Sequence, residues 1–252
     1  MSSARLIIDP PASGAWNMAV DEALLRSAAQ RGTATLRFYQ WSEPTLSLGY
    51  FQGADDRQQH FASLACPLVR RASGGGAIVH DRELTYSLAM PLSNTRTAQA
   101  TRLYDSVHAA LVECLATRGV AASLYSPADS CKSGASTARA IEPFLCFQRR
   151  TCGDIVCDGA KIVGSAQRRR RGAVLQHGSI LLARSSSAPE LPGIQELTGY
   201  PLTSDDIVMR LVGLLEGILP FHFEVQPLVE DERVLANSML TAFRDDVFTY
   251  RR

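Results

Sequence analysis

Asp154-Ile155-Val156-Cys157-Asp158-Gly159-Ala160-Lys161-Ile162-Val163-Gly164 carries the strongest structural signal in the sequence. Two apolar runs lie on either side of Asp158-Gly159, and an Asp-Gly pair in that setting is typical of a two-residue β-hairpin turn. We therefore expect two antiparallel strands here. A further apolar run over 174–182 predicts the next strand along the chain.

Other strands and helices are expected on both sides of this hairpin. Apolar and polar residues alternate over 36–41, and short apolar runs over 45–50, 67–71, 77–91 and 221–225 also predict strands. Helical spacing of apolar residues predicts helices over 14–31, 103–118, 204–219 and 231–246. The segment 126–140 is poor in large apolar residues, so we expect a mobile loop. The sequence thus predicts an α+β fold, with helices packed on a mixed or antiparallel β-sheet and one domain over 1–252.

Composition excludes several classes of protein. The chain has 252 residues, of which 46% are apolar and 20% charged, as in globular proteins rather than disordered ones. The net charge of +1 gives no overall attraction to nucleic acid or membrane. No apolar run approaches the ~18 residues of a membrane-spanning helix, and the N-terminal run is too short for a signal peptide. We therefore expect a cytoplasmic protein without disulfides or a C-x-x-C zinc site, although the chain has six cysteines.

A glycine cluster follows the strand expected over 67–71. Gly74, Gly75 and Gly76 lack side chains, so a ligand or another backbone segment can approach them closely. Their amides are suited to binding a carbonyl or phosphate oxygen. Arg71 and Ser73 before the cluster, and His80 after it, add polar groups. The alternative is a tight turn between two strands, but the Arg-Arg and His-Asp pairs around the cluster favour a binding site.

Cys146 and Lys161 are the candidate reactive residues. A thiolate is a strong nucleophile and needs nearby positive charge at neutral pH. Arg149 and Arg150 follow Cys146, and Lys161 reaches it if the hairpin folds beside it. An ammonium there could hold a developing oxyanion or a ligand carbonyl. The alternatives are a core cysteine between apolar neighbours and a solvated hairpin lysine.

Small and polar residues accompany these candidates on the two following strands. Gly164, Ser165 and Ala166 come directly after the lysine strand and leave room for a ligand. His177 offers a further polar group, although a single histidine on a strand is more often structural. The basic run 168–171 is interpreted as a solvated turn or a surface for an acidic protein, because no interleaved aromatic residues support RNA binding.

Taken together, the ordered motifs resemble the biotin/lipoate protein ligase catalytic superfamily over most of the chain up to about Leu182. The resemblance rests on these segments: Asn17-Met-Ala-Val-Asp21-Glu22, Leu36-Arg37-Phe38-Tyr39-x-Trp41, Pro44-Thr-Leu-Ser-Leu-Gly49-Tyr50, Arg70-Arg71-x-Ser73-Gly74-Gly75-Gly76-Ala77, His80-Asp81, Lys161-Ile-x-Gly164-Ser165-Ala166-Gln167 and His177-Gly178. Cys146-Phe147 upstream of the lysine hairpin is similar to the LipM-type octanoyltransferases. Lipoate ligases usually carry a Gly-Arg-x-Asp motif there.

The resemblance implies an octanoyltransferase that needs no cofactor or metal. Octanoyl would pass from acyl carrier protein to Cys146 and then to a lysine of a lipoyl domain. The implied acceptors are the glycine cleavage H protein and the acyltransferase subunits of 2-oxoacid dehydrogenases. Lys161 would hold the acyl carbonyl, with His80 as a weak candidate for the base. The pocket wall would comprise Arg71, Ser73, Gly74, Gly75, Gly76, His80, Gly164, Ser165, Ala166 and His177.

Three alternatives remain open from the sequence. The first is an ATP-dependent lipoate ligase on the same fold, and the second is an amidotransferase that moves octanoyl between lipoyl domains through the same cysteine. The third is a noncatalytic module that binds RNA through 168–171. Residues 183–252 diverge from the family pattern, and we expect them to form part of the catalytic domain rather than a separate accessory domain. Cys131, Cys152 and Cys157 match no family role.

Overall fold

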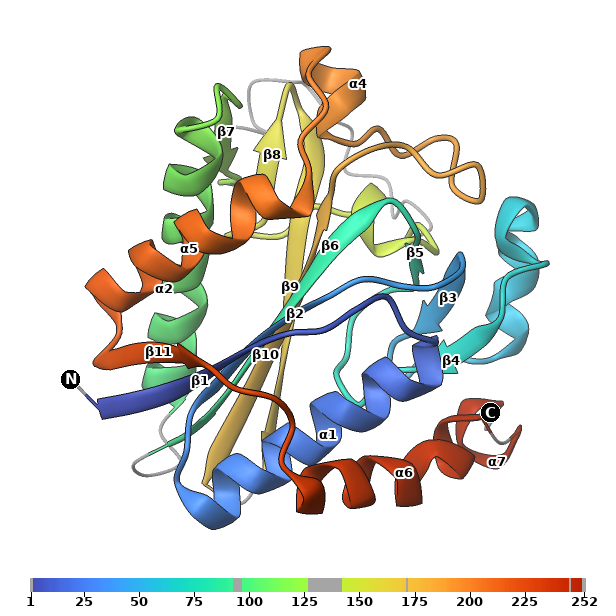
Figure 1. Ribbon diagram of the computed structural model, residues 1–252. Coiled ribbons are helices and arrows are strands. Elements are labelled where there is room, and N and C mark those ends of the chain that lie inside the picture. Colours follow the sequence, from blue (N-terminus) through green and yellow to red (C-terminus); the bar gives the residue numbers. More distant parts are fainter. Residues whose placement is uncertain (1, 93–96, 127–141, 171, 245, 251–252) are drawn as a thin grey trace.

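The computed structural model describes residues 2–92, 97–126, 142–170, 172–244 and 246–250 (Figure 1). The loop expected over 126–140 therefore lies outside the described residues, apart from Ser126. Within the described ranges, no helix has the length and apolar character needed to cross a membrane.

A large mixed β-sheet forms the centre of the molecule, as the sequence predicted (Figure 1). Its strands, in spatial order, are β11 (Phe221–Val225), β1 (Ser2–Ile8), β2 (Thr35–Tyr39), β6 (Glu83–Pro91), β10 (Ala173–Leu181), β9 (Ala160–Arg170), β8 (Ile155–Cys157) and β7 (Ala122–Leu124). The pairs β11–β1 and β1–β2 are parallel, and the remaining neighbours are antiparallel. Strand β1 was not predicted from the sequence, and it joins the C-terminal strand β11 to the rest of the sheet.

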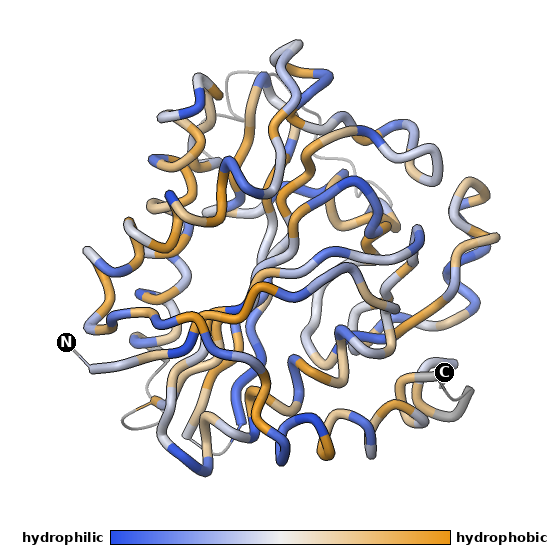
Figure 2. Tube along the Cα trace, viewed as in Figure 1, coloured by the Kyte–Doolittle hydropathy of each residue, from blue (hydrophilic) through white to orange (hydrophobic). Residues whose placement is uncertain are grey.

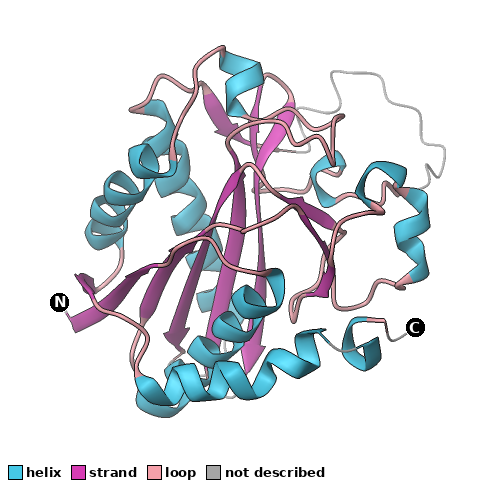
Figure 3. Cartoon of the chain, turned by 45° about the vertical axis from the view of Figure 1, so that its right-hand side comes forward, coloured by secondary structure: helices cyan, strands magenta, loops and turns pink. Residues whose placement is uncertain are grey.

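Helices cover both faces of this sheet (Figure 3). On one face, α2 (Thr97–Ala116) and α5 (Ser204–Ile218) bury an apolar cluster that includes Val107, Leu111 and Leu211. On the other face, α1 (Gly14–Arg31) packs on the strands through residues such as Leu24, and α6 (Glu230–Arg244) packs against α1. Hydrophobic and hydrophilic residues alternate along α5 and α6, as expected for helices that bury one face (Figure 2). The short helices α4 (Ile194–Thr198) and α7 (Asp246–Thr249) complete this part of the chain.

A small second sheet packs beside the end of the large one. It consists of β4 (Leu68–Arg70), β3 (Thr45–Leu48) and β5 (Ile78–His80), in that spatial order. The glycine cluster connects β4 to β5, so the strand expected before it over 67–71 is confirmed. The run 77–91 forms two strands rather than one, β5 in the small sheet and β6 in the large sheet, because the chain turns at Asp81 and Arg82. The short helices η1 (Asp55–Gln59) and η2 (Phe61–Ser63) lie between β3 and β4 in the chain. The single-turn helix η4 (Cys146–Gln148) follows Phe144 and Leu145, which pack in one apolar cluster with Leu46 and Val79 of the small sheet.

The predicted hairpin is present as β8 and β9, and its turn has the expected conformation. Asp158 and Gly159 both have positive φ, at 45° and 73°, as a turn of this handedness requires. The pairing then shifts, because Val156 lies opposite Lys161 whereas Ile155 lies opposite Val163. This β-bulge adds one residue, Ile162, to β9. Side chains normally alternate between the faces of a strand, so the extra residue brings positions 161 and 164 to the same face.

The structure corrects the prediction for the basic run 168–171. Arg168, Arg169 and Arg170 belong to strand β9 and pair with β10, so they do not form a turn. The Arg168 guanidinium lies 5.5 Å from the centre of the Tyr50 ring, and Arg170 forms an ion pair with Glu22 at 2.9 Å. The run looked like a turn because it contains no apolar residues, but the backbone ladder with β10 continues through it.

Arg37 of β2 is fully buried between the sheet and α1. It forms ion pairs with Asp9 at 2.7 Å and with Asp21 of α1 at 3.0 Å. Removing one member of a buried pair leaves the other charge without compensation. We predict that Arg37→Ala lowers the free energy of unfolding by about 3–5 kcal/mol, measured by urea denaturation.

Arg31→Ala is the matched control, since Arg31 forms an ion pair with Asp231 at the surface. It should cost less than about 1 kcal/mol. Equal losses in the two variants would contradict the structural importance assigned to Arg37.

Candidate active site

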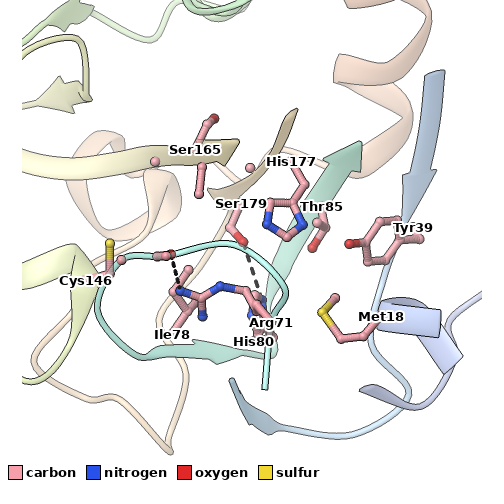
Figure 4. A pocket seen from close by; sticks show the side chains of 15 residues that line it. Met18, Tyr39, Arg71, Ile78, His80, Thr85, Cys146, Ser165, His177 and Ser179 are labelled. Atoms are coloured by element: carbon pink, nitrogen blue, oxygen red, sulfur yellow. Dashed lines mark hydrogen bonds between the residues drawn. The ribbon is translucent and has the colours of Figure 1, made fainter. Parts of the chain in front are cut away.

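A pocket opens where the glycine cluster faces strands of the large sheet. It is lined by Met18, Tyr39, Arg71, Gly74, Gly75, Ile78, His80, Thr85, Cys146, Gly164, Ser165, Ala166, His177, Gly178 and Ser179. Cys146 lies at one side, and Met18 and Tyr39 lie at the opposite side (Figure 4). Carbon atoms make up most of the lining, so the pocket suits an apolar chain with a polar group near the sulfur.

All the residues singled out in the sequence come together here. Nine of them line the pocket: Cys146, Arg71, Gly74, Gly75, His80, Gly164, Ser165, Ala166 and His177. The other three do not line the pocket but form hydrogen bonds with residues near it. Ser73 forms a hydrogen bond with His177, Gly76 accepts one from Arg71, and Lys161 donates to Cys146. Their sequence positions span more than a hundred residues, so it is the fold that assembles them.

Backbone hydrogen bonds fix Cys146 beside the end of the glycine cluster. The amide of Cys146 donates to the carbonyl of Ala77 at 2.7 Å, and the amide of Ala77 donates to the carbonyl of Phe144 at 3.1 Å. Leu145 is buried in the apolar cluster under the small sheet. The Cys146 side chain remains half-buried. A thiol held in this way stays accessible from the pocket while its backbone is anchored.

Lys161 supplies the positive charge beside this sulfur. Its Nζ lies 3.7 Å from Cys146 Sγ and 2.9 Å from a carboxylate oxygen of Asp154. The hairpin therefore folds beside Cys146, as the interpretation of Lys161 required. Arg149, one of the two arginines that follow Cys146 in the chain, instead forms an ion pair with Glu142 at 2.7 Å. The absence of a side chain at Gly164 makes room for Lys161, because a Cβ there would lie 2.5 Å from Lys161 Cε.

Arg71 holds the glycine cluster from inside. Its guanidinium donates to the carbonyl of Ser47 at 2.9 Å and to the carbonyl of Gly76 at 2.8 Å. Within the described residues it forms no ion pair with a carboxylate. Burial lowers the pKa of Arg71, and a negative charge on Cys146 would oppose that shift. Arg71 is therefore a second cation that an anionic sulfur or oxygen in the pocket would stabilise.

The glycine cluster itself adopts a conformation that other residues would disfavour. Gly75 has φ of +99°, in the left-handed region. Its carbonyl oxygen would lie 1.9 Å from a Cβ at Gly49, so the two backbones approach very closely. Among the described residues, the amides of Gly74, Gly75 and Gly76 donate no hydrogen bond. Gly74 and Gly75 line the pocket, so their amides lie where an oxygen of a ligand would approach.

Two buried histidines face the pocket with fixed hydrogen-bond partners. His177 Nδ1 lies 3.2 Å from the Asp21 carboxylate, and its Nε2 contacts the hydroxyl of Ser73. His80 Nδ1 lies 2.7 Å from the carboxylate of Glu83. Burial lowers the pKa of His80 even though the Glu83 charge opposes it. Both nitrogens of His80 are occupied, the second by the Ser47 hydroxyl at 2.7 Å, which disfavours His80 as the base.

Sequence reasoning missed His108, which lies on α2. Burial lowers the pKa of His108, so the ring is neutral at pH 7. Its Nδ1 must donate to the Gly153 carbonyl at 2.6 Å, since a carbonyl only accepts. Its Nε2 therefore accepts from the Ser165 hydroxyl at 2.7 Å, and Ser165 in turn accepts from Tyr86 at 2.7 Å. These hydrogen bonds fix the loop before β8 against α2, and nothing in the local sequence around His108 indicated them.

Sequence reasoning also gave no role to Asp154, although Asp154 directly precedes the first strand of the hairpin. Its carboxylate is 2% exposed and lies beside Lys161. An acidic residue at the start of an otherwise apolar strand was the available signal. No group of three or more His, Cys, Asp or Glu side chains in the described part of the chain is arranged to hold a metal ion. The site thus offers a thiol, a paired ammonium, a buried guanidinium and free backbone amides around an apolar pocket.

Comparisons with known proteins agree with this geometry. The family model of the lipoyl protein ligase A/B catalytic domain matches residues 13–189. An octanoyltransferase LipM from Kyrpidia tusciae is 32% identical over the full length of both chains. Another octanoyltransferase LipM, from Brevibacillus brevis, is 31% identical over the full length of both.

Solved structures show a similar fold. A putative lipoate protein ligase from T. acidophilum superposes with a TM-score of 0.77 at 23% identity, covering 98% of each chain. A lipoate-protein ligase A bound with ATP also gives a TM-score of 0.77, at 22% identity and 98% coverage of each chain. At these identities the structural similarity concerns the fold and leaves the chemistry open.

The lowered pKa values of His80 and His108 predict how stability depends on pH. Unfolded histidines bind a proton near pH 6.5, whereas these two stay neutral in the folded protein to lower pH. The unfolded state therefore binds more protons below about pH 6.5, and stability is lost there as the pH falls. Urea denaturation should give a lower free energy of unfolding at pH 5.5 than at pH 7.5. His108→Gln should reduce this difference.

Proposed function

Because the chain belongs to the lipoyl protein ligase A/B catalytic-domain family, we propose that it carries an octanoyl group as a thioester on Cys146. The chain is an acyltransferase, an octanoyltransferase of lipoate biosynthesis, like its full-length relatives. The observation that carries the proposed mechanism is the 3.7 Å distance between Lys161 Nζ and Cys146 Sγ at the side of an apolar pocket. This arrangement combines a nucleophile, a cation and a space for an acyl chain.

In the first step, the Cys146 thiolate attacks the thioester carbonyl of the octanoyl donor. A carbon–sulfur bond to Cys146 forms, the bond to the donor sulfur breaks, and the donor leaves as a thiolate that takes up a proton. The ammonium of Lys161 stabilises negative charge on the sulfur and on the carbonyl oxygen. The open amides of Gly74 and Gly75 provide further donors near the same oxygen.

In the second step, a neutral lysine amine of the acceptor attacks the thioester carbon. An amide forms, the bond to Cys146 breaks, and the attacking nitrogen gives up one further proton to solvent as the Cys146 thiolate is released beside Lys161. The acceptor lysine must first lose a proton, since a free lysine has a pKa near ~10.4. Exchange of one thioester for another is close to neutral in free energy, and forming an amide from a thioester is favourable. No nucleotide is therefore needed to drive either step.

The proposed donor is octanoyl-acyl carrier protein, and the proposed acceptor is a lipoyl domain. Both proteins would bring their reactive group to the open side of the pocket, where Cys146 lies. The proposal includes a single catalytic domain, supported by the pairing of C-terminal strand β11 with N-terminal strand β1 in one sheet. It also includes a cytoplasmic location, since the sequence has no apolar run long enough for a membrane-spanning helix and its N-terminal apolar run is too short for a signal peptide.

We predict that Cys146 becomes acylated when the protein is mixed with octanoyl-acyl carrier protein. Intact-mass spectrometry should show an octanoyl adduct that hydroxylamine removes, as it removes thioesters. Cys146→Ser should abolish the hydroxylamine-sensitive adduct, because it lacks the thiol. Cys152→Ser is the matched control, since Cys152 is exposed and six positions away. An adduct that maps to Cys152 or Cys157 would refute the assignment.

A second prediction separates the transferase from an ATP-dependent ligase of the same fold. A ligase activates a free acid as an acyl-adenylate, whereas a thioester is already activated. Octanoyl transfer from carrier protein to a lipoyl domain should therefore proceed without ATP and magnesium, measured by the mass of the modified domain. Free octanoate with ATP should give no product. ATP-dependent attachment of free lipoate that persists in Cys146→Ala would favour the ligase instead.

A further inference from the structure

We propose that Asp154 is a positioning residue that holds the ammonium of Lys161 directed at Cys146. This role rests on the proposed function, since it concerns the residue beside the nucleophile. Asp154 does not line the pocket, and it would act on the reaction only through Lys161.

The first argument is charge compensation. The side chains of Lys161 and Asp154 are 4% and 2% exposed, so both are removed from water. A buried ammonium without a counterion is unfavourable. The carboxylate 2.9 Å away supplies that counterion. Another N–H group of the same ammonium is directed at the sulfur 3.7 Å away.

The second argument is that Asp154 is itself held firmly. The same carboxylate oxygen accepts hydrogen bonds from the amide of Thr151 at 2.7 Å and from its hydroxyl at 3.0 Å. The carbonyl of Asp154 accepts from the amide of Tyr125 at 2.7 Å. The preceding residue, Gly153, is fixed to His108 of α2. The carboxylate therefore cannot follow Lys161 if the lysine moves, which makes it a fixed reference point.

The third argument is that the lysine strand is shaped to meet this carboxylate. The bulge at Ile162 places Lys161 on the face of Gly164, and the missing Cβ of Gly164 leaves space for the lysine chain. An ammonium has three donors. One reaches Asp154 and one reaches Cys146, which leaves a third donor for the oxygen of an acyl group. Removing the carboxylate would free the ammonium to turn away from the sulfur.

The test is a double-mutant cycle on single-turnover acylation of Cys146 by octanoyl-acyl carrier protein. Asp154→Asn keeps the shape of the side chain and removes the charge. We expect it to slow acylation on the order of 100-fold, as misplaced catalytic groups do, with little change in the donor concentration needed for half-maximal rate. Lys161→Ala should slow acylation at least as much. Asp154→Asn should cost nothing further in the Lys161→Ala protein, because the residue it acts through is gone.

Asp158→Asn is the matched control, because Asp158 belongs to the same hairpin and is exposed. It should acylate at the wild-type rate. Asp154→Glu keeps the charge and should recover part of the loss that Asp154→Asn causes. Circular dichroism and thermal unfolding would show that each variant is folded.

Two results would overturn the inference. One is a wild-type acylation rate in folded Asp154→Asn, and the other is an equal loss from that substitution with and without Lys161. Failure of the proposed function looks different, because wild-type protein would then form no thioester on Cys146 at all. The wild-type reaction thus reports on the function, and the cycle reports on Asp154.

Discussion

The buried carboxylate of Asp21 is the contact on which the arrangement of the site depends. It lies on α1 and accepts hydrogen bonds from Arg37 at 3.0 Å, Tyr39 at 3.0 Å and Ser87 at 2.8 Å, and it contacts His177 at 3.2 Å. These partners come from β2, β6 and β10, so one side chain joins the helix to three strands. Burial alone would raise the pKa of Asp21, but the His177 hydrogen bond and the Arg37 charge outweigh it and lower the pKa. The carboxylate is therefore charged over the physiological range.

This fixed helix and sheet form one wall of the pocket, and the glycine cluster forms the other. Arg71 bonds the carbonyls of the cluster from inside, so the cluster keeps its shape without large side chains. Tyr39 at the far side has its pKa raised well above the usual value by burial and by the Asp21 charge, so its hydroxyl stays neutral. The side chains of Met18 and Tyr39 at the far side of the pocket are thus neutral, and the ammonium of Lys161 lies beside Cys146. An acyl chain would have its apolar end beside Met18 and Tyr39 and its carbonyl near Cys146.

The fold alone leaves the chemistry undecided. A putative lipoate protein ligase and a lipoate-protein ligase A bound with ATP share a similar arrangement of helices and strands with this chain, with TM-scores of 0.77. In this chain a thiol lies beside the lysine of the hairpin, on a segment that pairs with the end of the glycine cluster. A thiol at this point is what the proposed covalent route requires, and the full-length relatives are octanoyltransferases.

The hairpin, the glycine cluster and the four long helices could be predicted from the sequence, because turn residues and apolar spacing are local signals. Asp158-Gly159 adopts its turn, and Cys146, Lys161 and His177 meet in one site. The sequence did not reveal β1 or the strand conformation of Arg168–Arg170, because each depends on pairing with a distant partner strand. The arrangement of the polar and charged groups around Lys161 depends on contacts between different elements of the tertiary structure. The bulge that turns Lys161 toward Gly164, the carboxylate of Asp154 and the His108 hydrogen bonds involve residues from different elements. Their effect depends on distances of a few ångströms, which spacing along a chain does not specify.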